Sequence, residues 1–318
     1  MKKQMTERFG DEIIYDIFPP APPSLNIELN NTCNQHCVFC PFHSKFVKKE
    51  ENPSHMNVEF AKKILDKAHE QGIGKKEIGF YSTGEALLHN GLEACIEYAK
   101  KLGCPYVFLT TNGVLATPER MLSLIHAGLD SIRFSVNAHD AALYHEIHGT
   151  DSFGTVMENI RFLSRQKKQH GLEISTSVSS VITRKTKDHM DVLHALFDDL
   201  VDEVVFIPVM DVEFLGEEVA SRYAVKESIL SNEERRVCPV PFNSMYIGSH
   251  GKARICCDAR ARDITAGNLN EEIDLMKLWK SDILVKYRKM HLNGDIGGSV
   301  CEGCQMTKRS IQKFFLDA

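Results

Sequence analysis

The feature that most constrains this chain is the distribution of its ten cysteines. Three lie close together near the N-terminus, five lie from residue 238 onward, and two lie between these groups: Cys33, Cys37 and Cys40; Cys238, Cys256, Cys257, Cys301 and Cys304; Cys95 and Cys104. In a reducing compartment, clustered cysteines bind metals or do redox chemistry more often than they form structural disulfides. We therefore interpret the two groups as two metal sites, and the two isolated cysteines as core thiols.

The rest of the composition is that of a globular protein, with 43% hydrophobic and 25% charged residues. No run approaches the roughly 18 apolar residues of a membrane span, and charged residues follow the N-terminal lysines where a signal peptide would be apolar. We expect a cytoplasmic protein with no membrane partner. The net charge of −5 argues against a nucleic-acid partner held by bulk electrostatics.

Short β-rich runs alternate with amphipathic helical stretches through the first two thirds of the chain. The predicted strands are 24–30, 77–83, 106–112, 131–137, 173–182 and 203–210, and the predicted helices are 57–72, 91–102, 118–127, 155–169 and 188–200. Repeated βα units without internal sequence repeats predict a parallel sheet with helices outside, and closed or nearly closed this is a TIM-like barrel. Its chemistry is expected at the C-terminal ends of the strands.

The pattern changes after Met210. We divide the chain into an N-terminal extension (1–23), the barrel (24–210), a connecting segment without a strand signal (211–237) and a small module (238–318). The module is predicted to contain a hairpin with Gly251 at its turn, a helix over about 273–291 and a cysteine-bearing tail. A module of this size has a thin core, and a bound metal cluster would supply the missing constraint.

The first cysteine group directly follows the first predicted strand. Three thiolates at Cys33, Cys37 and Cys40 can hold three irons of a [4Fe–4S] cube and leave the fourth iron open to a substrate or cofactor. A zinc site completed by His36 or His43 is an alternative, as is a group of neighbouring buried thiols.

This segment resembles the radical S-adenosylmethionine (radical SAM) superfamily, whose signature is C-x₃-C-x-aromatic-C, with Phe39 as the aromatic residue. The resemblance extends over roughly residues 22–210. It implies an α/β fold, a partial (β/α)6 TIM-like barrel, with SAM bound to the open iron. Reductive cleavage of SAM then yields a 5′-deoxyadenosyl radical that abstracts hydrogen from the substrate. An external one-electron reductant of the flavodoxin or ferredoxin type is also implied.

Further positions resemble the SAM-binding elements of the family in barrel order. Ser82-Thr83-Gly84-Glu85 resembles the GGE motif; Thr83 replaces its first glycine, so only Gly84 and Glu85 carry over. The other implied SAM contacts are Thr111 and Asn112 in a TNG element, Ser135 and Asn137 at the end of the fourth strand, and Ser180, with Ser179, on the fifth. Taken singly, each of these residues is also compatible with a turn, a helix cap or a strand-end hydroxyl.

The second cysteine group has the spacing C-x₁₂-G-x₄-C from Cys238 to Cys256, followed by the C-x₂-C pair of Cys301 and Cys304. It resembles the SPASM extension of the family, and more closely its shortened form, Twitch, which implies one auxiliary [4Fe–4S] cluster. A zinc ribbon is the alternative. The remaining thiol, Cys257, is interpreted as a buried thiol, an exchangeable ligand, or a hydrogen-atom donor to a substrate radical.

The expected function is a radical SAM oxidoreductase (dehydrogenase) or epimerase. Its substrate would be a small polar molecule, namely a sugar, aminocyclitol or nucleoside, because only about 20 residues precede the first strand and leave little room for a peptide-recognition domain. A peptide-modifying radical SAM enzyme and a zinc or iron–sulfur electron-transfer protein are the alternatives. Substrate contacts remain open among His139, Tyr144, His148, Arg184 and Arg260.

Overall fold

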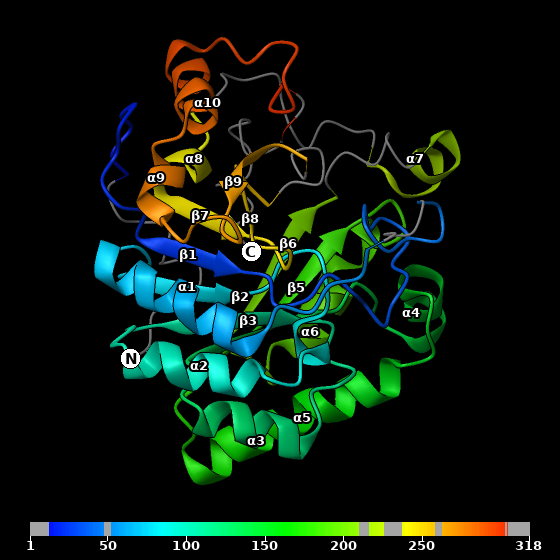
Figure 1. Cartoon of the computed structure of the whole chain (residues 1–318). Coiled ribbons are helices and arrows are strands. Elements are labelled where there is room, and N and C mark those ends of the chain that lie inside the picture. The colour runs from blue at the N-terminus through cyan, green and yellow to red at the C-terminus, as the bar shows by residue number, and fades with distance from the viewer. Residues whose placement is uncertain are drawn as a thin grey trace.

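A computed structural model describes residues 13–47, 52–209, 216–225, 237–257, 263–302 and 304. The described strands form one sheet in the order β6-β5-β4-β3-β2-β1-β7-β8-β9, with helices packed on its outer side (Figure 1). The first six strands follow one another in sequence order and are all parallel. The sheet is therefore an open, partial (β/α)6 barrel, as predicted.

The six barrel strands lie within the predicted ranges. They are β1 (Ser24–Ile27), β2 (Glu77–Phe80), β3 (Val107–Thr111), β4 (Ser131–Ser135), β5 (Ser175–Ile182) and β6 (Glu203–Pro208). β1 and β2 each end three residues earlier than predicted. After β1 the Glu28 amide still donates to the Ile247 carbonyl of a neighbouring strand, whereas the Asn31 amide donates to the Ser54 carbonyl in a loop. Alternation along β1 places Leu25 and Ile27 in the core, and Asn26 and Glu28 on the opposite side of the strand.

The helices predicted for the barrel are present, and the structure adds one more α-helix there. The barrel helices are α1 (Val58–Gln71), α2 (Leu92–Lys101), α3 (Pro118–His126), α4 (Ala141–His148), α5 (Phe153–His170) and α6 (Met190–Phe197), with short 3₁₀ turns η2 (Ala86–Leu88) and η3 (Lys187–His189). α4 was not predicted, although its signals are local: the Asp140 side chain caps its first turn, and Gly149 ends it in a left-handed conformation.

The C-terminal module extends the barrel sheet instead of forming a separate layer. Its strands are β7 (Ser244–Ile247), β8 (Lys252–Arg254) and β9 (Thr265–Asn268), and β7 pairs in parallel with β1. β7 and β8 form the predicted antiparallel hairpin, and Gly251 at its turn has a φ of 77° that favours glycine. The helices of the connecting segment and module are α7 (Glu217–Tyr223), α8 (Val240–Asn243), α9 (Leu275–Trp279) and α10 (Asp282–Asn293).

The single helix predicted over 273–291 is wrong in one respect, because it is two helices. Ser281 between them adopts an extended conformation, with φ −62° and ψ 152°, and breaks the helical run. The break lets the Trp279 indole donate to the Pro20 carbonyl at 2.9 Å, while Arg288 donates to the Ile17 carbonyl at 3.3 Å. The module is thereby tied to the segment that leads into β1.

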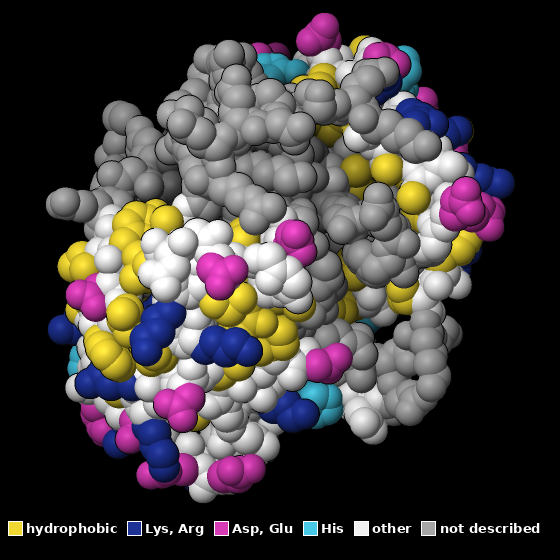
Figure 2. All heavy atoms as spheres, turned by 90° about the horizontal axis from the view of Figure 1, so that it is seen from above, with side chains coloured by type: hydrophobic (Ala, Val, Ile, Leu, Met, Phe, Trp, Pro, Cys, Tyr) yellow, Lys and Arg dark blue, Asp and Glu magenta, His cyan; other side chains and the backbone are white. Residues whose placement is uncertain are grey.

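The described surface has no dominant charge sign on the face seen from above, where Lys, Arg, Asp and Glu side chains are interspersed (Figure 2). Among the described helices, none has the length and apolar character needed to cross a membrane.

Candidate cofactor and cluster sites

The first three cysteines lie in the loop that follows β1, at the C-terminal end of the strand. Each sulfur has its own polar neighbour: the Asn112 side-chain amide lies 3.8 Å from Cys33 Sγ, the His148 Nδ1 lies 3.4 Å from Cys37 Sγ, and the His43 backbone amide donates to Cys40 Sγ at 3.3 Å. Because hydrogen bonds to sulfur favour the thiolate, these neighbours suit a set of cluster ligands.

The thiols are close enough to influence one another electrostatically. Burial raises the pKa of Cys33 to about 11 and that of Cys37 well above its usual value, and the neighbouring thiolates raise both further. Iron bound here would supply the positive charge that compensates buried thiolates. No three His, Cys, Asp or Glu side chains of the described residues converge on one point as the ligands of a single ion would.

His148, at the end of α4, orients the Cys37 loop. It is completely buried, and burial lowers its pKa to about 3, so the ring is neutral. The Asn137 backbone amide donates to Nε2 at 3.1 Å, which leaves the ring proton on Nδ1, between the Gln35 Oε1 at 2.9 Å and the Cys37 sulfur. His148 therefore connects the first cysteine loop to Asn137, which sequence analysis assigned to SAM binding.

Gly84 and Glu85 lie directly against the segment that leads to Cys33. A Cβ atom at Gly84 would lie 2.3 Å from the Asn30 carbonyl oxygen and 2.7 Å from that of Thr32, so only glycine fits there. The Asn30 side-chain amide in turn donates to the Glu85 carbonyl at 2.7 Å. The close approach of the Asn30 and Thr32 carbonyls thus explains why Gly84 is a glycine. The first position of the GGE-like motif has no such requirement and is occupied by Thr83.

The Glu85 carboxylate is buried and accepts three hydrogen bonds, from the Leu87 amide at 3.0 Å, the Thr111 hydroxyl at 2.6 Å and the Asn112 amide at 2.7 Å. Burial raises its pKa. It therefore caps the short helix η2 and joins the loops after β2 and β3. A carboxylate has about four acceptor positions, so these three donors leave acceptor capacity for one more donor, such as an ammonium group.

The remaining predicted SAM contacts lie on neighbouring strand ends. Asn137 accepts a hydrogen bond from the Val181 amide at 2.6 Å, Ser135 pairs with Ser179 across β4 and β5, and the Ser180 hydroxyl donates to the Val136 carbonyl. Phe39 packs with the small apolar cluster around Val38 and Ile147. Their roles in binding SAM stay predictions.

The second cysteine group gathers in the module. Burial raises the pKa of Cys238, and Cys304, Cys301 and Cys257 raise it further, which places these thiols near one another. Burial raises the pKa of Tyr287, and Cys301 and Cys256 raise it further. Cys238 and Cys304 are buried, Cys256 and Cys301 are half-buried, and Cys257 is exposed. The interpretation of Cys257 as a buried thiol is therefore wrong, because the chain presents it to solvent.

The structure also shows the surroundings of several candidate substrate contacts. Tyr144 and His148 are completely buried and support the cysteine loop through Gln35, which sequence analysis did not single out. Arg184 donates to the Ser221 carbonyl at 2.8 Å, and Arg260 lies outside the described residues. The His43 ring bonds to the Thr83 carbonyl at 3.0 Å.

Comparison with known sequences identifies the class. The radical SAM superfamily matches residues 27–197, and the SPASM iron–sulfur cluster-binding domain matches residues 238–305. Because the first match covers more than half of the chain, the protein belongs to the radical SAM superfamily, and it carries a C-terminal SPASM domain. Its cofactors are S-adenosylmethionine and [4Fe–4S] clusters, one of them auxiliary.

Three individual relatives have sequence identities of 26% to 33% with this chain. The GTP 3′,8-cyclase of Chlorobaculum tepidum is 26% identical over 307 residues, covering 88% of this chain and 86% of that protein. A probable GTP 3′,8-cyclase of Thermoplasma volcanium is 28% identical over 46% of this chain, and the PqqA peptide cyclase of Streptomyces rochei is 33% identical over 41%. The chain spans only 43% and 34% of the length of these last two proteins.

Solved structures share the fold. BtrN in complex with AdoMet and 2-DOIA has a TM-score of 0.58 at 18% identity, covering 90% of this chain and 94% of that one. SuiB of Streptococcus suis bound to the precursor peptide SuiA has a TM-score of 0.62 at 16% identity, covering 92% and 70%. Native anSMEcpe with bound AdoMet has a TM-score of 0.63 at 16% identity, covering 93% and 91%.

Proposed function

We propose that this radical SAM enzyme epimerises a small polar substrate, a sugar, aminocyclitol or nucleoside, and that Cys257 returns the hydrogen atom. The observation that carries the proposal is the exposed thiol of Cys257. Burial raises the pKa of the Tyr81 phenol, near the Gly84-Glu85 motif, and Cys257 is close enough to raise it further. All ten cysteines lie among the described residues, and Cys257 is the one that is exposed. A thiol that reaches solvent can meet a substrate.

Two phenols support this position for Cys257. The Tyr81 hydroxyl, one residue before the Ser82-Thr83-Gly84-Glu85 motif, lies 3.4 Å from the Tyr246 hydroxyl on β7. Burial raises the pKa of both phenols, and the nearby Cys257 thiolate raises both further. The loop of residues 82–85, the proposed SAM loop, follows Tyr81 directly. Cys257 from the module and this loop from the barrel therefore approach the same pair of tyrosines.

The hydrogen atoms balance in the proposed reaction. SAM bound at the first cluster supplies, on one-electron reduction, the radical that removes one hydrogen atom from a substrate carbon. The Cys257 S–H then gives one hydrogen atom to the opposite face of that carbon, which forms a C–H bond and leaves a thiyl. One electron from a flavodoxin- or ferredoxin-type reductant and one proton from solvent restore the thiol. Oxidation, the competing outcome, removes a proton and an electron from the substrate radical instead.

Solvent deuterium tests the assignment. The reconstituted protein, reduced anaerobically with SAM in D₂O, should place one deuterium at the inverted carbon of its product, because a thiol exchanges with solvent. Cys257→Ala should keep both clusters and SAM cleavage while losing epimer formation. An oxidised product, or an unchanged yield of epimer from the variant, would rule Cys257 out as the donor.

Peptide modification is the second candidate, and the similarity to the PqqA peptide cyclase and to SuiB bound to SuiA favours it. The release of 5′-deoxyadenosine separates the two candidates. 2-DOIA, as an aminocyclitol probe, should stimulate release more than the SuiA peptide does. Stimulation by the peptide alone would replace the small-substrate proposal.

A further inference from the structure

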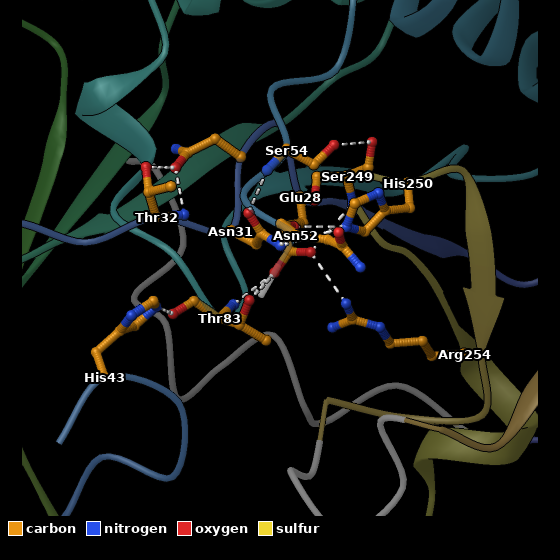
Figure 3. A network of polar contacts seen from close by, with 11 residues as sticks. Glu28, Asn31, Thr32, His43, Asn52, Ser54, Thr83, Ser249, His250 and Arg254 are labelled. Carbon is orange, nitrogen blue, oxygen red and sulfur yellow. Dashed lines mark hydrogen bonds and ion pairs between the residues drawn. The ribbon is translucent and has the colours of Figure 1, made fainter. Parts of the chain in front are cut away.

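A buried ion pair joins the barrel to the module. Arg254 on β8 donates to Glu28, just after β1, at 3.1 Å, with side chains that are 14% and 1% exposed (Figure 3). The Ser249 amide in the hairpin turn donates to the same Glu28 oxygen at 3.1 Å. Removing one partner of such a pair leaves a buried charge without compensation, so the pair strongly fixes the position of the hairpin relative to β1.

The other Glu28 oxygen holds the proposed SAM loop. It accepts the Thr83 backbone amide at 2.8 Å and also the Thr83 hydroxyl. Thr83 is the residue that replaces the first glycine of the family motif, and glycine has no hydroxyl to donate. The replacement therefore adds a bond that anchors the loop carrying Gly84 and Glu85 to Glu28.

The same contacts continue to the first cysteine loop. The Thr83 carbonyl bonds to the His43 ring at 3.0 Å, and the His43 backbone amide donates to Cys40 Sγ at 3.3 Å. At its other end the chain of contacts reaches Arg254, two residues before Cys256. Hydrogen bonds thus connect the loop of one cysteine group to the hairpin of the other through one carboxylate.

A second set of hydrogen bonds holds the hairpin turn from the side of residues 52–54. The Ser54 hydroxyl donates to the Ser249 carbonyl at 3.2 Å, and the Ser54 amide donates to Asn31 Oδ1 at 2.7 Å (Figure 3). The His250 ring bonds to the Asn52 carbonyl at 3.1 Å. The turn is thereby clamped against the segment before Cys33, so that Glu28 and Arg254 meet in a defined geometry.

We propose that Glu28 is a positioning residue through which Arg254 of the module sets the geometry of the SAM-binding loop and contributes to SAM affinity. Arg254 acts on SAM through Glu28 and Thr83. The inference concerns cofactor binding and holds for either reaction outcome and for any substrate. Equilibrium dialysis of labelled SAM against the reconstituted, oxidised enzyme measures it without turnover, so its failure is distinguishable from failure of the proposed epimerisation.

The decisive measurement is a double-mutant cycle. Glu28→Gln and Arg254→Met should each weaken SAM binding about 5- to 20-fold, the lower part of the range of a typical coupling between sites. The double variant should bind SAM no more weakly than the single variant with the lower SAM affinity. Both substitutions interrupt the same chain of contacts, from Arg254 through Glu28 to Thr83. Effects that multiply would mean that Arg254 acts on SAM by another route and would overturn the proposal.

Two controls separate positioning from folding. Arg161→Met removes a second Arg–Glu pair, to Glu158, with the same 3.1 Å separation but with side chains 44% and 67% exposed, and it should leave SAM affinity unchanged. Thr83→Val alters the barrel side alone and should weaken binding, while Thr83→Ser keeps the hydroxyl and should bind as wild type. Iron and sulfide content identifies any variant that loses a cluster. If Thr83→Val retains its clusters and binds SAM within about twofold of wild type, the proposal is wrong whatever Arg254→Met does.

Discussion

The Nδ1 atom of His148 lies 3.4 Å from the Sγ atom of Cys37. His148 is on α4, 111 residues further along the chain than Cys37. Because Nε2 accepts the Asn137 amide, the proton is on Nδ1 and is available to the sulfur and to Gln35. A hydrogen bond to a ligand sulfur stabilises the reduced form of a cluster.

Replacing His148 should therefore make the first cluster harder to reduce. His148→Phe is expected to lower the midpoint potential by several tens of millivolts, as measured by an anaerobic redox titration followed by electron paramagnetic resonance. His145→Phe alters an exposed imidazole on the same helix, paired with Asp151, and should leave the potential unchanged. Equal potentials in the His148 variant and wild type would contradict the role given to this ring.

Gly84→Ala should abolish SAM binding while leaving the first cluster assembled. The added methyl would lie 2.3 Å from the Asn30 carbonyl oxygen, so the loop carrying Gly84 and Glu85 must move away from the segment before Cys33. Equilibrium dialysis with labelled SAM measures the loss, and iron content reports the cluster. Gly154→Ala, at an exposed helical position with open space around it, should bind SAM normally.

Arg288→Met should destabilise the module. Arg288 is completely buried, donates to the Pro241 carbonyl at 2.8 Å and to the Trp279 carbonyl at 2.9 Å, and lies 4.1 Å from the centre of the Trp279 ring. Leaving buried carbonyls without donors should cost about 3 kcal/mol of unfolding free energy. Denaturant unfolding measures this cost, with Lys289→Met, one exposed residue further along, as the control. A loss below about 1 kcal/mol would show that neighbouring groups replace the guanidinium.

His291 should make the protein sensitive to acid. It is 4% exposed, and burial lowers its pKa. In the unfolded chain the His291 imidazole becomes protonated at about pH 6.5, whereas in the folded protein it stays neutral to lower pH. The free energy of unfolding therefore decreases as the pH falls below about 6.5.

His291→Leu removes this contribution. Its melting temperature relative to wild type should therefore rise as the pH is lowered from 8 to about 5. His126→Leu, at an exposed position on α3, gives the baseline for losing a surface imidazole. A difference between the His291 variant and wild type that is independent of pH would contradict the prediction.

Local patterns in the sequence were enough to predict the partial barrel. The βα alternation, the three cysteines after the first strand and the Gly251 hairpin each depend on residues near one another in the chain. The helix that carries His148 was missed even though Asp140 and Gly149 mark its ends, because its short, mixed sequence has a weak apolar face. The break at Ser281 was missed because the run around it keeps helical periodicity.

What the sequence by itself determined is the chemistry available: two groups of thiols, a Gly-Glu motif and a radical SAM barrel. The tertiary structure alone decided how the two halves meet. β7 pairs with β1, Arg254 meets Glu28 across 226 positions of the chain, and His148 reaches Cys37 across 111. Such contacts form only when the whole sheet assembles, because no spacing or periodicity encodes which distant polar groups share a buried site. The exposure of Cys257, beside the proposed ligand Cys256, is likewise a property of the folded module.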